Sequence, residues 1–164
     1  MVNINIVADT TKLGIFFIFL ALSAVSCEND KNDVVPDVYI DFVMNLQDIE
    51  FVNLSAMFGY VYVNANTNNW GLKAAGFNNN GLIVFAGIEG EFYAYDRTCP
   101  HDYFVNNNSV KVNVVDIIYA ECPLCKTRYA LTAGGTPLPG TTGRYPLKNY
   151  KTSLSGNYLQ VWNH

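Results

Sequence analysis

The chain has 164 residues, of which 50% are hydrophobic and 14% are aromatic, so it can bury one good core but has no room for a second sizeable domain. Its net charge is -4 and its basic residues are scattered, which gives nucleic-acid binding no electrostatic basis. The chain has two histidines, and one of them is the terminal His164, so hydrolysis by a Ser-His or Cys-His pair is not expected.

Residues 1–26 have the layout of an export signal. Lys12 precedes an apolar run of fourteen residues, 13–26, which suits a signal peptide and is short for a membrane span. Ala24 and Ser26 lie directly before Cys27, and this arrangement resembles the lipobox of bacterial lipoproteins. The resemblance implies cleavage before Cys27, acylation of its thiol and a lipid anchor at the bacterial cell envelope, in the outer membrane or facing the periplasm. A transmembrane anchor with a buried cysteine is the alternative.

Residues 27–37 follow as the acylated cysteine and a short polar, acidic tether that Pro36 closes. From residue 38 to 164 short apolar or alternating runs are separated by turn signals, which predicts an all-β domain. A short helix is expected only within 46–58. The expected strands are 38–46, 60–64, 72–76, 82–86, 91–96, 111–115, 117–121, 129–132, 147–153 and 158–162.

Four turns have a recognisable chemistry. Asn80-Gly81 favours a tight type I′ hairpin. Positions that tolerate positive φ between strands are supplied by Glu89-Gly90, Gly134-Gly135 and Ser155-Gly156-Asn157.

Three of the four cysteines lie in two short loops together with a histidine. Cys99-Pro100-His101 is followed, after an interval of twenty residues (102–121), by Cys122-Pro123-Leu124-Cys125. Thiolate and imidazole are the donors that hold zinc and iron-sulfur clusters, and two close pairs on separate loops can converge on one centre. The sequence therefore predicts a metal site. A disulfide between Cys122 and Cys125, or between Cys99 and Cys122, is the alternative.

These loops and the strands around them resemble the Rieske family, over roughly residues 80 to 162. The resemblance implies a small antiparallel β-sandwich or barrel with a cluster-binding subdomain of two loops. It also implies a [2Fe-2S] cluster, with Cys99, His101 and Cys122 as ligands. Thr127 stands where the family places a hydroxyl that can hydrogen-bond the cluster, and Tyr129 stands at its aromatic position.

One departure from the family pattern matters. Cys125 stands where the family has its second histidine, so we infer Cys125 as the fourth ligand on chemical grounds. Three thiolates and one imidazole are also a complete set for a structural Zn²⁺ site. The first arginine of the chain is Arg97, so the N-terminus lacks the paired arginines of signals that export prefolded cofactor proteins.

The expected function is that of an envelope-anchored Rieske-like protein that transfers single electrons to a redox partner protein. With no room for a mononuclear-iron domain, the chain is expected to be a carrier or subunit and not a complete enzyme. A zinc site of three cysteines and one histidine, or a metal-free disulfide form, in a lipoprotein binding module is the competing expectation.

Overall fold

The structure is a computed structural model that describes residues 33–67, 70–71 and 75–163, with the side chains of 70 and 71 left out. The expected signal peptide and the lipidation site Cys27 lie outside the described residues, as does part of the expected strand 72–76. No helix in the described part of the chain is long and apolar enough to span a membrane.

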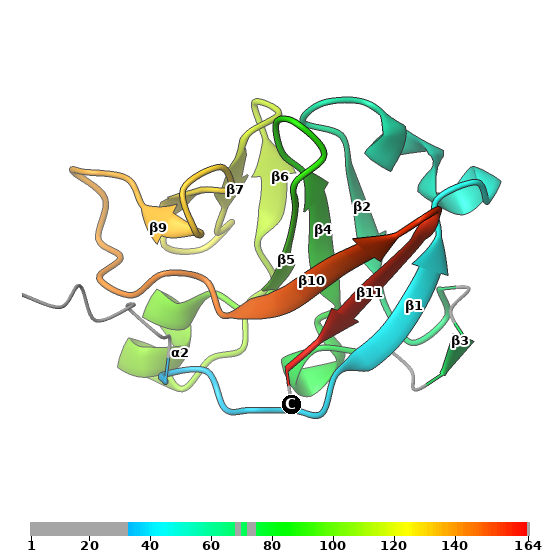
Figure 1. Ribbon diagram of the computed structural model, residues 1–164. Helices are drawn as coiled ribbons and strands as arrows, with labels where there is room; N and C mark the ends of the chain where they lie inside the picture. Colours follow the sequence, from blue (N-terminus) through cyan, green and yellow to red (C-terminus); the bar gives the residue numbers. More distant parts are fainter. Residues whose placement is uncertain (1–32, 68–69, 72–74, 164) are drawn as a thin grey trace, which may run out of the picture.

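The larger of two antiparallel sheets has seven strands in the order β2-β4-β5-β10-β11-β1-β3 and curls into a half-barrel (Figure 1). Its hairpins β4–β5 and β10–β11 turn at the glycine-containing segments that the sequence predicts, where Glu89, Gly90 and Gly156 have positive φ. The strands are β1 (Asp41–Asn45), β2 (Tyr60–Val63), β3 (Trp70–Gly71), β4 (Leu82–Ala86), β5 (Phe92–Asp96), β10 (Asn149–Ser155) and β11 (Tyr158–Trp162).

The smaller sheet has four antiparallel strands in the order β6-β7-β8-β9 and forms a separate unit beside the larger one (Figure 1). It is inserted between β5 and β10 in the chain, together with the helix α2 (Pro100–Asn106). Its strands are β6 (Asn113–Val115), β7 (Tyr119–Glu121), β8 (Arg128–Ala130) and β9 (Thr136–Pro137). The expected all-β class, with a subdomain of two loops, is thus confirmed.

Strand β4 separates two hydrophobic cores. All five of its residues are buried, because alternate side chains of a strand point to opposite faces and both faces are covered. Leu82 and Val84 pack into the core under β1 and β11, whereas Ile83 and Phe85 pack into the core that also contains Cys99 and Cys122. The thiol loops are therefore part of the second core.

The helical segments differ from the sequence expectation. The expected short helix within 46–58 is a 3-10 helix, η1 (Ile49–Ser55). The expected hairpin at Asn80-Gly81 is wrong: a 3-10 turn, η2 (Phe77–Asn79), precedes β4, which pairs with β2 and β5 instead. Gly81 adopts a positive φ, but Asn80 has a φ of -70°, so the two residues do not form the type I′ turn, which needs a positive φ at both positions.

Candidate metal centre

The first loop continues directly from Cys99 into α2. Cys99 is the N-cap residue, Pro100 occupies the first helical turn, where its missing N–H is not needed, and Asn107 ends the helix in the left-handed conformation. The Cys99 N–H donates to Val110 O at 2.8 Å, and the Tyr103 N–H donates to Cys99 O at 3.1 Å. These bonds fix Cys99 at the start of one helical turn.

The second loop is the turn between β7 and β8. The Cys122 N–H donates to Thr127 O at 3.0 Å, and the Lys126 N–H donates to Cys122 O at 3.0 Å, with Lys126 at a φ of 60°. Cys122 and Cys125 are thus the ends of a compact turn that the β7–β8 pairing holds in place.

The two loops bring four donor atoms together at the junction of α2 and the small sheet. The thiols of Cys99, Cys122 and Cys125 and a carboxylate oxygen of Asp102 all lie within 4.8 Å of one another. Cys99 Sγ is 3.6 Å from Cys125 Sγ, and the Cys122 thiol donates to Asp102 Oδ2 at 2.9 Å. This is the one such group among the residues that the structure describes.

The predicted meeting of Cys99, Cys122 and Cys125 is therefore found in the structure. All three are free thiols, so neither of the disulfides considered from the sequence is formed. His101 is half-buried on α2 and does not belong to the donor group, whereas its neighbour Asp102 does.

Asp102 is the member of the donor group that the sequence reasoning missed. The residue is 2% exposed, although it lies in a connection between strands. The available signal was Pro100 followed by an acidic residue in a first helical turn, a pattern typical of a helix N-terminus. A helix places residues 99 and 102 on one face and turns residue 101 away by about 100°.

Burial and hydrogen bonding set the protonation of this group. Burial by itself raises the pKa of Asp102. Hydrogen bonds from the thiols of Cys122, Cys125 and Cys99 lower it, and the neighbouring His101 adds a smaller effect in the same direction. These effects outweigh burial, so the pKa of Asp102 lies below the usual range of a carboxyl. The pKa of the Cys122 thiol is raised by its contact with Cys99, by burial and by its bond to Asp102. Without a metal, hydrogen bonds from protonated thiols thus stabilise the ionised carboxylate of Asp102.

Hydroxyl groups surround the thiols. The Tyr129 hydroxyl lies 3.3 Å from Cys99 Sγ, and the Cys125 thiol donates to Thr127 Oγ1 at 3.3 Å. Burial raises the pKa of Tyr129, so it is a neutral hydrogen-bonding group. Thr127 is fully buried, and its hydroxyl also contacts Thr142 Oγ1 at 3.0 Å.

The donor spacing fits one metal ion better than a two-iron cluster. Two thiolates at about 2.3 Å from one tetrahedral ion lie about 3.8 Å apart, close to the separation of Cys99 and Cys125. In the Rieske arrangement those two residues bind different irons, with the cluster between them, and must lie farther apart. As the loops are arranged here, the residues do not fit a [2Fe-2S] cluster.

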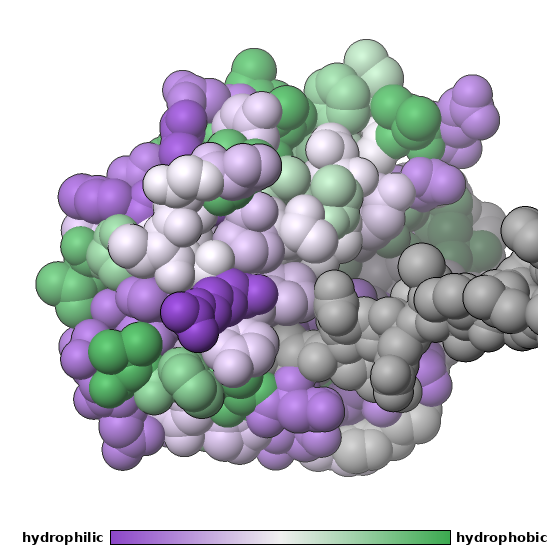
Figure 2. Space-filling view, turned by 90° about the vertical axis from the view of Figure 1, so that its left-hand side faces the viewer, coloured by the Kyte–Doolittle hydropathy of each residue, from purple (hydrophilic) through white to green (hydrophobic). Residues whose placement is uncertain are grey.

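The end of the molecule that carries α2 and β9 displays a mixed surface. In Figure 2, hydrophobic side chains lie there between polar ones. Phe104 and Val105 on α2 and Leu124 in the second loop are each more than half exposed. Apolar side chains thus lie on both loops that hold the donor group.

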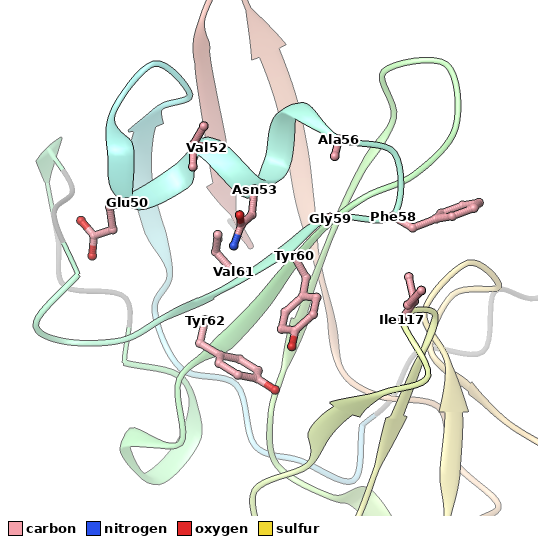
Figure 3. Close-up of a pocket in the computed structure, with 10 residues that line it drawn as sticks. All are labelled: Glu50, Val52, Asn53, Ala56, Phe58, Gly59, Tyr60, Val61, Tyr62 and Ile117. Atoms are coloured by element: carbon pink, nitrogen blue, oxygen red, sulfur yellow. The ribbon is translucent and has the colours of Figure 1, made fainter.

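A cavity of about 700 Å³ lies at another part of the molecule, along the edge strand β2. Figure 3 shows the rings of Tyr60 and Tyr62 projecting from β2, with η1 forming the opposite wall and Ile117 at the rim. None of the four donor residues lines it. The donor group therefore lies outside this cavity.

No protein-family model and no curated protein matches the chain. Solved structures are similar to it. A plasma membrane Rieske protein of Synechocystis is 25% identical, with a TM-score of 0.42 over 62% of this chain and 97% of that one. The ferredoxin of carbazole 1,9a-dioxygenase from Nocardioides aromaticivorans is 15% identical, with a TM-score of 0.44 over 78% of this chain and 100% of that one.

A complex of oxygenase and ferredoxin of carbazole 1,9a-dioxygenase is 17% identical, with a TM-score of 0.37 over 68% of this chain and 30% of that one. A Rieske protein and ferredoxins are thus among the solved structures that this chain resembles.

Proposed function

We propose that this chain is a thiolate metalloprotein with a Rieske-like fold, in which Cys99, Cys122 and Cys125 bind one metal centre. The observation that carries the proposal is the convergence of three thiols and a carboxylate within 4.8 Å, from two loops that are distant in sequence. Such a set completes the tetrahedral coordination of a structural ion, with no open position for a substrate.

A closed metal site would act by joining the two loops. Without it, α2 and the β7–β8 turn meet through weak contacts such as Cys99 Sγ to Cys125 Sγ. A bound ion would hold the loops together and fix the exposed side chains of Phe104, Val105 and Leu124 relative to one another. We infer that this end of the domain is a rigid surface that binds a partner protein.

The second candidate is an electron carrier with a [2Fe-2S] cluster and a redox partner protein. The Cys-x-His and Cys-x-x-Cys spacing favours it, as does the Thr127 hydroxyl beside Cys125, since hydrogen bonds to cluster sulfurs tune such centres. It requires His101 to replace Asp102 as a donor and Cys99 to move away from Cys125.

The test is the metal and acid-labile sulfide content of protein solubilised without air from its native envelope. About one zinc per chain, lost in a Cys122→Ser variant, is the expected result. About two irons and two sulfides would establish the electron carrier. No metal in the native protein, with binding of neither Zn²⁺ nor iron after reduction, would overturn the metalloprotein proposal.

The lipid anchor belongs to the same proposal. The apolar run that ends at Cys27, with the acidic tether after it, supports attachment to the bacterial cell envelope, with residues 38–164 outside the cytoplasm. We expect the mature N-terminus to be an acylated Cys27 by mass spectrometry, and a Cys27→Ala variant to leave the membrane fraction. An unmodified Cys27 in membrane-bound protein would contradict the lipid anchor.

A further inference from the structure

We propose that Asp102, and not His101, is the fourth ligand of the metal centre, so that the site is a mononuclear zinc-type site of three cysteines and one aspartate. The inference rests on the proposed metal binding and specifies its ligand set. It follows from the geometry of the two loops, from the burial of the carboxylate and from the charge of the group.

The two loops present their donors in the same way. Cys99 and Asp102 are three residues apart, as are Cys122 and Cys125. In each loop the carbonyl of the first donor residue accepts a backbone N–H from the fourth residue after it, namely Tyr103 and Lys126. In each loop this hydrogen bond closes a turn around the two donors, which have the x₂ spacing of structural zinc sites.

The same turn excludes His101 from the donor face. A Cys-x-His pair can bind one centre from an extended loop, but here the chain enters α2 at Pro100. Adjacent residues of a helix point about 100° apart, so a helix that directs Asp102 toward the thiols directs His101 elsewhere. Moving His101 into the group would require the first turn of α2 to unwind.

Burial of the carboxylate points to a cation. Asp102 is 2% exposed, and none of the ion pairs found among the described residues involves it. Its partners are thiols, with Cys122 Sγ at 2.9 Å. Thiol protons stabilise the buried carboxylate in the metal-free protein. When the thiols lose these protons, a divalent ion at the centre of the four donors would take over that role. Three thiolates and a carboxylate carry the same formal charge as the common zinc set of four cysteines.

The experiment compares Asp102→Asn with His101→Asn in the folded protein, using Zn²⁺ and Co²⁺ as probes in competition with a chelator. Asn keeps the size of Asp and an oxygen that accepts the Cys122 hydrogen bond, so the fold is preserved while the anionic ligand is lost. We expect Asp102→Asn to weaken binding of both ions by at least about tenfold. His101→Asn is the matched control on the preceding residue of α2 and is expected to bind like the wild type.

A third variant tests whether position 102 acts as a ligand. Asp102→Cys completes a set of four cysteines and is expected to restore zinc binding and a tetrahedral Co²⁺ spectrum with stronger sulfur-to-metal charge transfer. Circular dichroism of each metal-free variant verifies the fold.

The outcomes separate the two proposals. The assignment of Asp102 as a ligand is overturned if His101→Asn loses metal binding while Asp102→Asn retains it. It is also overturned if both variants bind metal with wild-type affinity. Neither result contradicts the proposal that the protein binds a metal. Two irons and two sulfides in the wild type also overturn it. Failure of the wild type to bind any metal overturns the metalloprotein proposal itself.

Discussion

At the scale of single residues, the thiols are held by buried hydroxyl groups from the small sheet and its loops. Thr127 is fully buried beside Cys125, and Tyr129 contacts Cys99. Gly143 packs so closely on Thr127 that a Cβ built at Gly143 would lie 2.4 Å from Thr127 Cγ2. The hydroxyl of Thr127 is thus fixed in direction, because its side chain has no free space in which to rotate.

Replacing Thr127 by Val tests this hydroxyl. Val has nearly the same shape but leaves the Cys125 thiol and the Thr142 hydroxyl without their partner. We expect the free energy of unfolding of the reduced, metal-free protein to fall by about 1 kcal/mol, measured by urea denaturation. Thr142→Val is the control, because it removes only the bond between the two hydroxyls and leaves Thr127 in contact with Cys125. An equal loss in both variants would contradict the specific role of Thr127.

At the scale of elements, α2 decides which side chains face the thiols. The helix has only seven residues, so its two ends matter more than its helix propensity. Asn107 ends it with a φ of 50°, and its N–H donates to Tyr103 O at 2.9 Å. A left-handed residue at this position satisfies the last carbonyls of the helix and is best supplied by Gly or Asn.

Substitutions at Asn107 test the end of α2. Because Asn107 is exposed, Asn107→Ala changes little packing but forces Ala into the left-handed region. We expect Asn107→Ala to lower the free energy of unfolding by about 1 kcal/mol, and Asn107→Gly to leave it unchanged or raise it. Urea denaturation measures both. Since α2 carries Asp102, the Ala variant is also expected to bind Zn²⁺ more weakly, and an unchanged affinity would show that the helix end does not matter to the site.

At the scale of the whole molecule, the fold consists of two cores that share β4. The first is closed by β1, β10 and β11, and the second holds the thiols under the small sheet. A metal that links the two loops therefore stabilises the second core directly and the first only through the shared sheet.

Metal removal tests this division. With free Zn²⁺ at about a thousand times its dissociation constant, binding adds about 4 kcal/mol to the free energy of unfolding. A chelator is expected to remove this gain and to increase hydrogen exchange of the amides in residues 98–112 and 122–130. The amides of β4 and β11 are expected to remain protected. Uniform loss of protection over both cores would show that the metal controls the whole fold.

Alkaline pH tests the buried tyrosines of both cores. Burial raises the pKa values of Tyr95 and Tyr150 well above that of an exposed tyrosine, with the nearby Tyr93 and Asp96 adding to the effect. Above about pH 10 the unfolded chain loses phenol protons that the folded protein keeps. The free energy of unfolding therefore falls as pH rises, by about 1.4 kcal/mol per pH unit for each such phenol.

Urea denaturation between about pH 9 and 11 measures this slope. Tyr95→Phe loses the hydrogen bond to Leu131 O and is expected to be less stable at every pH. Its free energy of unfolding is expected to fall less steeply with pH than that of the wild type, because one titrating phenol is missing. An unchanged slope in Tyr95→Phe would mean that Tyr95 ionises equally in the folded and unfolded states.

The sequence by itself determined most strands and the two thiol loops. The alternating side chains of β11 and the turn at Glu89-Gly90 depend on neighbouring residues, and so does the spacing of Cys122 and Cys125. Such local patterns can be read without knowledge of distant contacts. The thiol pairs also predicted that two loops would converge, although not how closely.

Only the tertiary structure decided which residue completes the site. Residues 100–106 form a helix because the bond from Cys99 N–H to Val110 O and the packing of Asp102 under the second loop stabilise it, and both depend on parts of the chain beyond the helix. The direction of a side chain changes when the backbone changes from extended to helical. The motif therefore pointed to His101, whereas the fold turns Asp102 toward the thiols.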